Sequence, residues 1–254
     1  ILLIAIFFIV NFIITNRQAT HPIVHFHTLF SKKPFVGATM AISSHLTLLT
    51  GIAGINVYIV RILKLPFDIS LHFYFFFFVG VIITGILKMF FYSSVGAGFL
   101  GTLGSSALLY VSIHWIILGN TINIPLLYIQ GLLLGFGASM TLVSGSMATL
   151  LDGDLKEAAQ RSQTMHTIRN FSAAMLIPII AYTIKNHIQK GTQSIYAENI
   201  TDKMIYLKKL QDVAIDADHQ IFLLMIIFNM VMFVSSIIQM ILGKGRRITP
   251  PRES

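Results

Sequence analysis

The fold class of this chain is decided by residues 69–92, ISLHFYFFFFVGVIITGILKMFFY. Lys88 is the only charged residue in this stretch, and a helix needs roughly 17–25 apolar residues to cross the hydrocarbon core of a bilayer. The apolar character is continuous, whereas a strand of a membrane barrel alternates apolar and polar side chains. The stretch therefore predicts a membrane-spanning α-helix.

Similar apolar segments recur along the whole chain, which predicts an all-α polytopic membrane helix bundle. We expect about seven spans, the first of them truncated, over residues 1–15, 35–62, 69–92, 98–118, 124–149, 163–188 and 219–242. The first segment lacks the basic start and the small-residue cleavage pattern of a signal peptide. We therefore expect it to be the rest of a truncated helix, and the chain to be a piece of a longer protein.

The composition agrees with a membrane environment. Of the 254 residues, 55% are hydrophobic and only 11% are charged, whereas a soluble domain has about 25% charged residues. There is no Cys, which excludes disulfides, thiolate metal ligands and Cys nucleophiles. The net charge is +8, but the basic residues are scattered through short loops, which favours topology control over nucleic-acid binding.

Lys and Arg residues in the short loops indicate the orientation, because they favour the cytoplasmic side. We expect residues 1–33 to be a truncated helix and basic cytoplasmic linker, and residues 34–242 to be a six-helix unit. Residues 189–218 mix both signs of charge and are expected to form a long outer loop. The tail, residues 243–254, is basic and is expected to be cytoplasmic. The predicted location is the cell or inner membrane, with multiple passes.

Three histidines lie close together in the first linker, at His21, His25 and His27. Three imidazoles could in principle bind a metal ion. However, the segment contains Pro22 and has no nearby Asp, Glu or Cys. We therefore interpret it as a short amphipathic connector at the membrane surface and expect no metal site.

Polar side chains inside the spans are the candidates for function, because each is costly in hydrocarbon. The candidates for a substrate path are His45, Asn56, Gln130, Arg169, Asn170 and Asn229. Each is also compatible with an ordinary hydrogen bond between helices. For Arg169, the alternative is a structural ion pair with an acid of the preceding loop, Asp152, Asp154 or Glu157.

The span at residues 124–149 is rich in small residues. Gly131 and Gly135 lie four residues apart and are followed by Gly137, a spacing that lets helix backbones approach closely. This indicates either ordinary helix packing or a close-packed helix that moves during a transport cycle. Trp115 is expected in an aromatic belt at the membrane interface.

No catalytic set is recognisable in the sequence. It has no Ser/His pair with an acidic partner in register, no H-E-x-x-H and no phosphate-binding loop. We expect neither an enzyme nor a cofactor. Acidic residues fall at span edges or in the expected loops, so we expect no proton-carrying carboxylate in these spans.

The order of the motifs resembles the fourteen-helix drug:proton antiporter branch of the major facilitator superfamily. The first match is the linker with HPIV and LFSKKPF, at Arg17, His21, Pro22, Ile23, Val24, Leu29, Phe30, Lys33 and Phe35. The second is QGLLLGFGASM, an acidic loop and RSQTMHTIRNFSAAML, in which Arg169 takes the position of the family's Arg. The third is a long outer loop before a last helix and a basic tail.

The resemblance implies that these spans are the eighth to fourteenth helices, and so the carboxy-terminal half of a secondary active exporter. Its expected partners are the lipid bilayer, a small amphipathic organic substrate and the proton, whose site is expected in the absent amino-terminal half. Alternating access would occur between two six-helix halves. The alternatives are an uptake carrier of the same superfamily and a non-transporting membrane scaffold.

Overall fold

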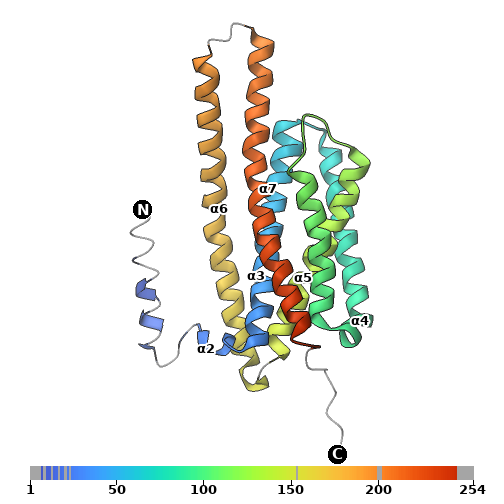
Figure 1. Cartoon of the computed structure of the whole chain (residues 1–254), viewed down its shortest axis with the longest axis vertical. Helices are drawn as coiled ribbons and strands as arrows, with labels where there is room; N and C mark the ends of the chain where they lie inside the picture. Colours follow the sequence, from blue (N-terminus) through green and yellow to red (C-terminus); the bar gives the residue numbers. More distant parts are fainter. Residues whose placement is uncertain are drawn as a thin grey trace, which may run out of the picture.

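The computed structural model describes residues 7, 10–12, 14–16, 18–19, 22, 24–152, 154–198 and 202–244 (Figure 1). The elements are α2 (Phe26–Leu29), α3 (Lys32–Asn56), η1 (Val57–Ile62), α4 (Phe67–Trp115), α5 (Ile124–Leu151), η2 (Leu155–Glu157), α6 (Ala158–Ala197) and α7 (Lys203–Ile241). No strand occurs in these ranges, so the all-α class is confirmed for the described residues. The expected first span is described only in part, and His21, Arg17, Ile23 and residues 245–254 lie outside the described residues.

Five helices are long and apolar enough to cross a membrane. These are Lys32–Ile62, Phe67–Trp115, Ile124–Leu151, Ala158–Tyr196 and Lys203–Ile241. Such helices are compatible with a multi-pass membrane protein. The end of the first of them, η1, is a π-helix rather than an α-helix.

The helix α4 contains two of the expected spans, because it reverses direction at Gly96 (Figure 1). Gly96 has φ 83° and ψ 170°, a backbone conformation that glycine adopts without steric cost. The rings of Phe73 and Trp115 are 6.3 Å apart, whereas an uninterrupted helix would separate them by about 60 Å. The two limbs of α4 lie at the positions where helices were expected, at residues 69–92 and 98–118, but the second limb ends at Trp115.

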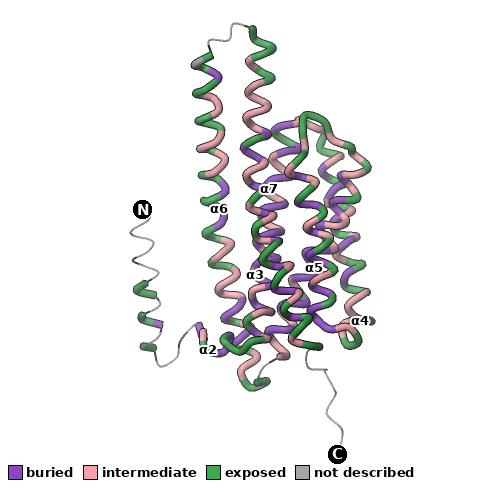
Figure 2. Tube along the Cα trace, in the orientation of Figure 1, coloured by how far each residue is buried: buried purple, intermediate pink, exposed green. Residues whose placement is uncertain are grey.

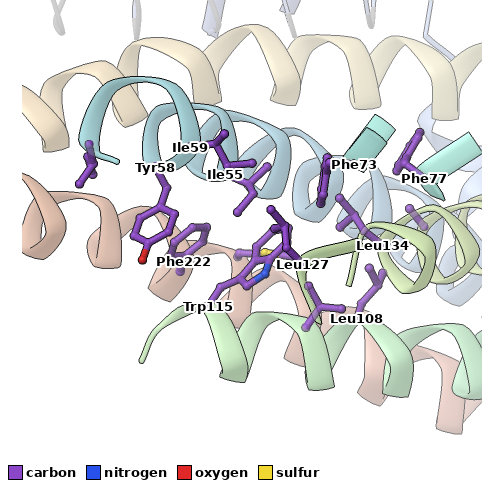
Figure 3. Packing of buried hydrophobic residues seen from close by; sticks show 14 of the residues in the cluster. Ile55, Tyr58, Ile59, Phe73, Phe77, Leu108, Trp115, Leu127, Leu134 and Phe222 are labelled. Atoms are coloured by element: carbon purple, nitrogen blue, oxygen red, sulfur yellow. The ribbon is translucent and has the colours of Figure 1, made fainter. Parts of the chain in front are cut away.

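The main hydrophobic core lies among α3, η1, α4, α5 and α7 (Figure 3). Trp115 is fully buried there, with its ring 5.3 Å from that of Phe222 and close to Phe73. The expectation of an aromatic-belt position for Trp115 is therefore wrong. The reason is that the second limb of α4 turns this residue towards α5 and α7 rather than outwards.

The helices α6 and α7 extend together beyond the rest of the bundle (Figures 1 and 2). The prediction of a long irregular loop at residues 189–218 is wrong in its secondary structure, because α6 continues to Ala197 and α7 begins at Lys203. Asp202 caps α7 by accepting a hydrogen bond from the backbone N–H of Met204 at 2.7 Å. The charged residues that suggested a loop are compatible with a helical hairpin because they alternate with apolar residues along both helices.

Contacts between the two arms hold the hairpin together. A Cβ at Gly191 would lie 2.5 Å from a methyl group of Val213, so the arms approach closely there. Lys209 forms an ion pair with Glu198, and the rings of Tyr196 and Tyr206 are 6.1 Å apart.

Candidate functional site

Two of the candidate polar residues form hydrogen bonds between helices. The indole N–H of Trp115 on α4 donates to Oε1 of Gln130 on α5 at 2.8 Å, and both side chains are buried. The amide of Asn229 on α7 donates to Oγ of Ser112 on α4 at 3.3 Å. These contacts pair polar groups inside the core and link neighbouring helices, although Oδ1 of Asn229 itself makes no hydrogen bond to the described residues.

Asn56 lies at the end of α3, where it is half-buried. Its side chain lies close to that of Tyr74 on α4. It therefore joins α3 to the first limb of α4, away from the remaining candidates.

The other candidates come together where α3 packs against α6. His45 lies near the middle of α3, and His166 and Arg169 lie one turn apart on α6. Arg169 is within electrostatic range of both imidazoles. Asn170 is the next residue of α6 and is exposed. The structure thus brings one guanidinium and two imidazoles together from two helices. We call this group the α3–α6 cluster (His45, His166 and Arg169).

Apolar contacts between the same two helices lie on either side of the α3–α6 cluster. Ala41 and Met165 belong to one buried group, and Leu46 and Leu176 belong to another. The cluster therefore sits inside the length of the bundle rather than at an end. A guanidinium at such a depth is costly unless it has a partner.

Arg169 has no acidic partner among the described residues. Its Nε is buried and makes no hydrogen bond there. Glu157, one of the three expected partners, lies instead 3.7 Å from Nη1 of Arg161. The α3–α6 cluster is consequently suited to accept an anionic or hydrogen-bond-accepting group.

Arg161 is a structural residue that the sequence analysis did not single out. It is almost fully buried, and its guanidinium donates from Nε to the carbonyl of Thr149 at 3.0 Å and from Nη2 to that of Leu150 at 2.9 Å. These are carbonyls of the last turn of α5, which have no partner within the helix. Arg161 therefore fixes the turn between α5 and α6.

The glycines of α5 lie against both limbs of α4. A Cβ at Gly135 would clash with the carbonyl of Phe77, and one at Gly131 would lie 2.8 Å from that of Phe73. A Cβ at Gly137 would lie 2.6 Å from the carbonyl of Gly104, on the second limb. Small residues at these positions therefore allow close contact between helix backbones.

His25 and His27, the two described histidines of the linker, lie close to each other. The linker also contacts the bundle. The rings of His25 and His27 are 6.1 Å apart. The backbone N–H of His25 donates to Oγ1 of Thr164 on α6 at 2.9 Å. The linker is thereby docked on the end of α6.

A buried carboxyl group lies where the sequence analysis expected a loop. Asp218 on α7 is only 1% exposed, so its placement in an outer loop is wrong. It lines a cavity of about 170 Å³ together with Arg61 and with Ile184 of α6. Ile215, Asp218 and Phe222 recur at the spacing of one helix face. The neighbouring Ile215 and Phe222 are both buried, so this periodicity is the signal that could have located Asp218.

Comparison with known proteins gives no match, either to a family model or to a curated sequence. Function is therefore inferred from the residues of this chain.

Proposed function

We propose that this chain forms one half of a secondary active membrane transporter that exports amphipathic organic compounds in exchange for protons. In this proposal two six-helix halves alternate access to a central path. The protein lies in the cell or inner membrane with its carboxy terminus in the cytoplasm. The observation that carries the proposal is the α3–α6 cluster, a cationic group within the bundle that has no acidic partner among the described residues.

The position of the cluster on α6 supports a path between two halves. Only 11% of the most apolar stretch of α6 is buried, compared with 56% for Lys32–Ile62 (Figure 2). Ionisable residues in membrane helices face a bundle interior or an aqueous cavity rather than lipid. A second bundle against the poorly covered side of α6 would give Arg169 such surroundings.

The side chains near the cluster suit an amphipathic molecule. Arg169 and the two imidazoles offer donors for an anionic or acceptor-rich group. The exposed side chains of Phe171 and Met175, on the same helix, offer apolar surface for the rest of the molecule. Methionine and aromatic side chains adapt to ligands of different shape.

The test uses the complete reading frame that contains this chain, expressed in a host deficient in efflux. Loss of an amphipathic dye from loaded cells is followed with and without a proton gradient. We expect gradient-dependent loss, and we expect Arg169→Ala to raise the dye concentration for half-maximal export by about tenfold or more, because a charge-assisted hydrogen bond is lost.

Lys185→Ala is the matched control, because Lys185 is an exposed basic residue on the same helix. It should export dye like the unchanged protein. Dye loss that ignores the gradient, or equal export by the Arg169 and Lys185 variants, would contradict the proposal. No movement of solute in either direction would instead favour a membrane scaffold.

Uptake of an organic anion is the second candidate function. It is favoured by the same absence of an acidic partner for Arg169 among the described residues. The two functions differ in the direction of proton movement. In vesicles of known orientation, substrate-induced proton flow against the substrate supports export, and flow with the substrate supports uptake.

A further inference from the structure

Asp218 combines deep burial with the absence of hydrogen-bond partners. Neither carboxyl oxygen makes a hydrogen bond to the described residues, although the side chain is 1% exposed. The residues beside it on α7 are engaged in other contacts. His219 contacts the carbonyl of Leu118 through Nε2 at 2.8 Å, and Asp212 accepts a hydrogen bond from Asn120 at 3.3 Å.

The cavity beside Asp218 is mostly apolar. Val57, Ile62, Ile184, Ile188 and Ala214 line it with Asp218 itself. An ionised carboxyl group in such a cavity, without a partner, is strongly disfavoured. The carboxyl group is therefore stable there when it carries a proton or when a cation reaches it.

One cation is available on the facing helix. Arg61 of η1 lines the same cavity but forms no ion pair with Asp218. The other titratable group of η1 within electrostatic range is Tyr58, whose hydroxyl already donates to the carbonyl of Gly119. Within the described chain, α4, α5 and α6 contribute no titratable side chain to this cavity.

The cavity adjoins a wider hollow at the surface. A hollow of about 500 Å³ shares Arg61, Ile62 and Ala214 with it and is also lined by Lys64. Arg61, which is exposed, lines both the wider hollow and the cavity of Asp218.

The element that carries Arg61 is itself unusual. Val57–Ile62 is a π-helix of 6 residues at the end of α3. Such segments are rare and occur frequently at functional sites, where a change in hydrogen-bond register shifts the side chains. The buried carboxyl, the facing cation and the irregular helix are three separate observations at one place.

We propose that Asp218 is a proton-binding site and that Arg61 replaces the proton. In this proposal the carboxyl group carries its proton while Arg61 forms no ion pair with it, as in the arrangement described above. On release the O–H bond breaks, the proton passes to water in the wider hollow, and the guanidinium of Arg61 moves in to donate hydrogen bonds to the carboxylate. Asp218 thus alternates between a protonated state and a state paired with Arg61. This alternation links proton binding to the position of η1 against α7. Use of this site for coupling rests on the proposed transport function, whereas the proton site itself does not.

The test is labelling by dicyclohexylcarbodiimide, an apolar reagent that reacts with protonated carboxyl groups. The complete protein is labelled in membranes from about pH 5 to about pH 9, a range in which exposed Asp residues are ionised, and the modified residue is quantified by mass spectrometry. We expect labelling of Asp218 that falls as the pH rises. Asp216, exposed on the same helix, should remain unlabelled.

Arg61→Gln tests the partner. Without the guanidinium the ionised form loses its stabilising charge, so labelling should persist to higher pH, by about one unit or more. Lys64→Gln is the matched control, because Lys64 lines the wider hollow but not the cavity of Asp218. The Lys64 variant should leave unchanged the pH at which labelling of Asp218 is half-maximal.

No labelling of Asp218 at any pH would overturn the proton site, and equal midpoints for the Arg61 and Lys64 variants would overturn the role of Arg61. The proposed function fails separately. If Asp218 is labelled as expected but the protein moves no dye, the proton site is supported and the transport function is contradicted. If dye export depends on the gradient but Asp218 is not labelled, the transport function is supported and the proton site is contradicted.

Discussion

Individual polar residues in this protein differ mainly in whether a partner is within reach. Arg161 and Arg169 lie on the same helix, two turns apart. Arg161 donates to two carbonyls at the end of α5, whereas Arg169 lies near two imidazoles and has no acidic partner among the described residues. The same side chain is therefore a structural clamp at one position and a candidate binding group at the other.

Replacing Arg161 by Met should lower the free energy of unfolding by about 2–4 kcal/mol, because two charge-assisted hydrogen bonds are lost and their buried carbonyls are left unpaired. Reversible unfolding in mixed micelles measures this. Glu157→Gln removes only the 3.7 Å contact with a half-exposed carboxylate and should cost less than about 1 kcal/mol. Equal losses would show that the ion pair, rather than the carbonyl contacts, anchors the turn.

At the scale of helices, the close contact between α4 and α5 depends on glycine residues of α5. Both limbs of α4 place backbone carbonyls directly against glycines of α5. The helices can approach this closely only because no Cβ intervenes. A glycine on the outside of α4 has no such role.

Gly135→Ala should destabilise the bundle by about 3 kcal/mol or more, since its Cβ would overlap the carbonyl of Phe77 and force the helices apart. Gly85→Ala is the matched control on α4, because nothing lies within 4 Å of a Cβ there. It should be neutral or stabilising by up to about 1 kcal/mol. Similar unfolding midpoints for both variants would contradict the close contact between α4 and α5 at Gly135.

At the scale of the whole molecule, the hairpin of α6 and α7 is the feature that extends beyond the bundle (Figure 1). Its two arms are long helices of 40 and 39 residues. Gly191 of α6 lies directly against Val213 of α7, so the two arms approach each other closely there. The same pair of helices carries Arg169, on α6, and Asp218, on α7.

The hairpin can be tested directly because the chain has no native Cys. The pair Gly191→Cys and Val213→Cys should form a disulfide under mild oxidation, since a Cβ at Gly191 lies 3.2 Å from that of Val213, near the distance of a disulfide. Gly191→Cys with Lys208→Cys should remain reduced, because Lys208 is five residues from Val213 on α7 and so lies about 140° around the helix from it. Loss of free thiols is the measurement. Equal oxidation of both pairs would indicate a flexible loop.

Much of the fold followed from local sequence. The apolar runs predicted the helical class and the spans, including both limbs of α4, because the length and hydropathy of a segment determine whether it can cross a bilayer. The helical hairpin at residues 189–218 was missed because its mixed charge is typical of a loop as well as of a helix exposed to water. Only the contacts between its arms distinguish the two.

The sequence by itself determined the membrane-type helices, the glycine-rich α5 and the polar residues that need an explanation. The tertiary structure alone decided which of those residues have partners. Gln130 and Asn229 each form a hydrogen bond with α4, whereas Arg169 has no acidic partner among the described residues and Asp218 lines a cavity together with Arg61. The physical reason is that crossing a bilayer depends on one segment at a time, whereas the partner of a side chain depends on how several helices are rotated against one another.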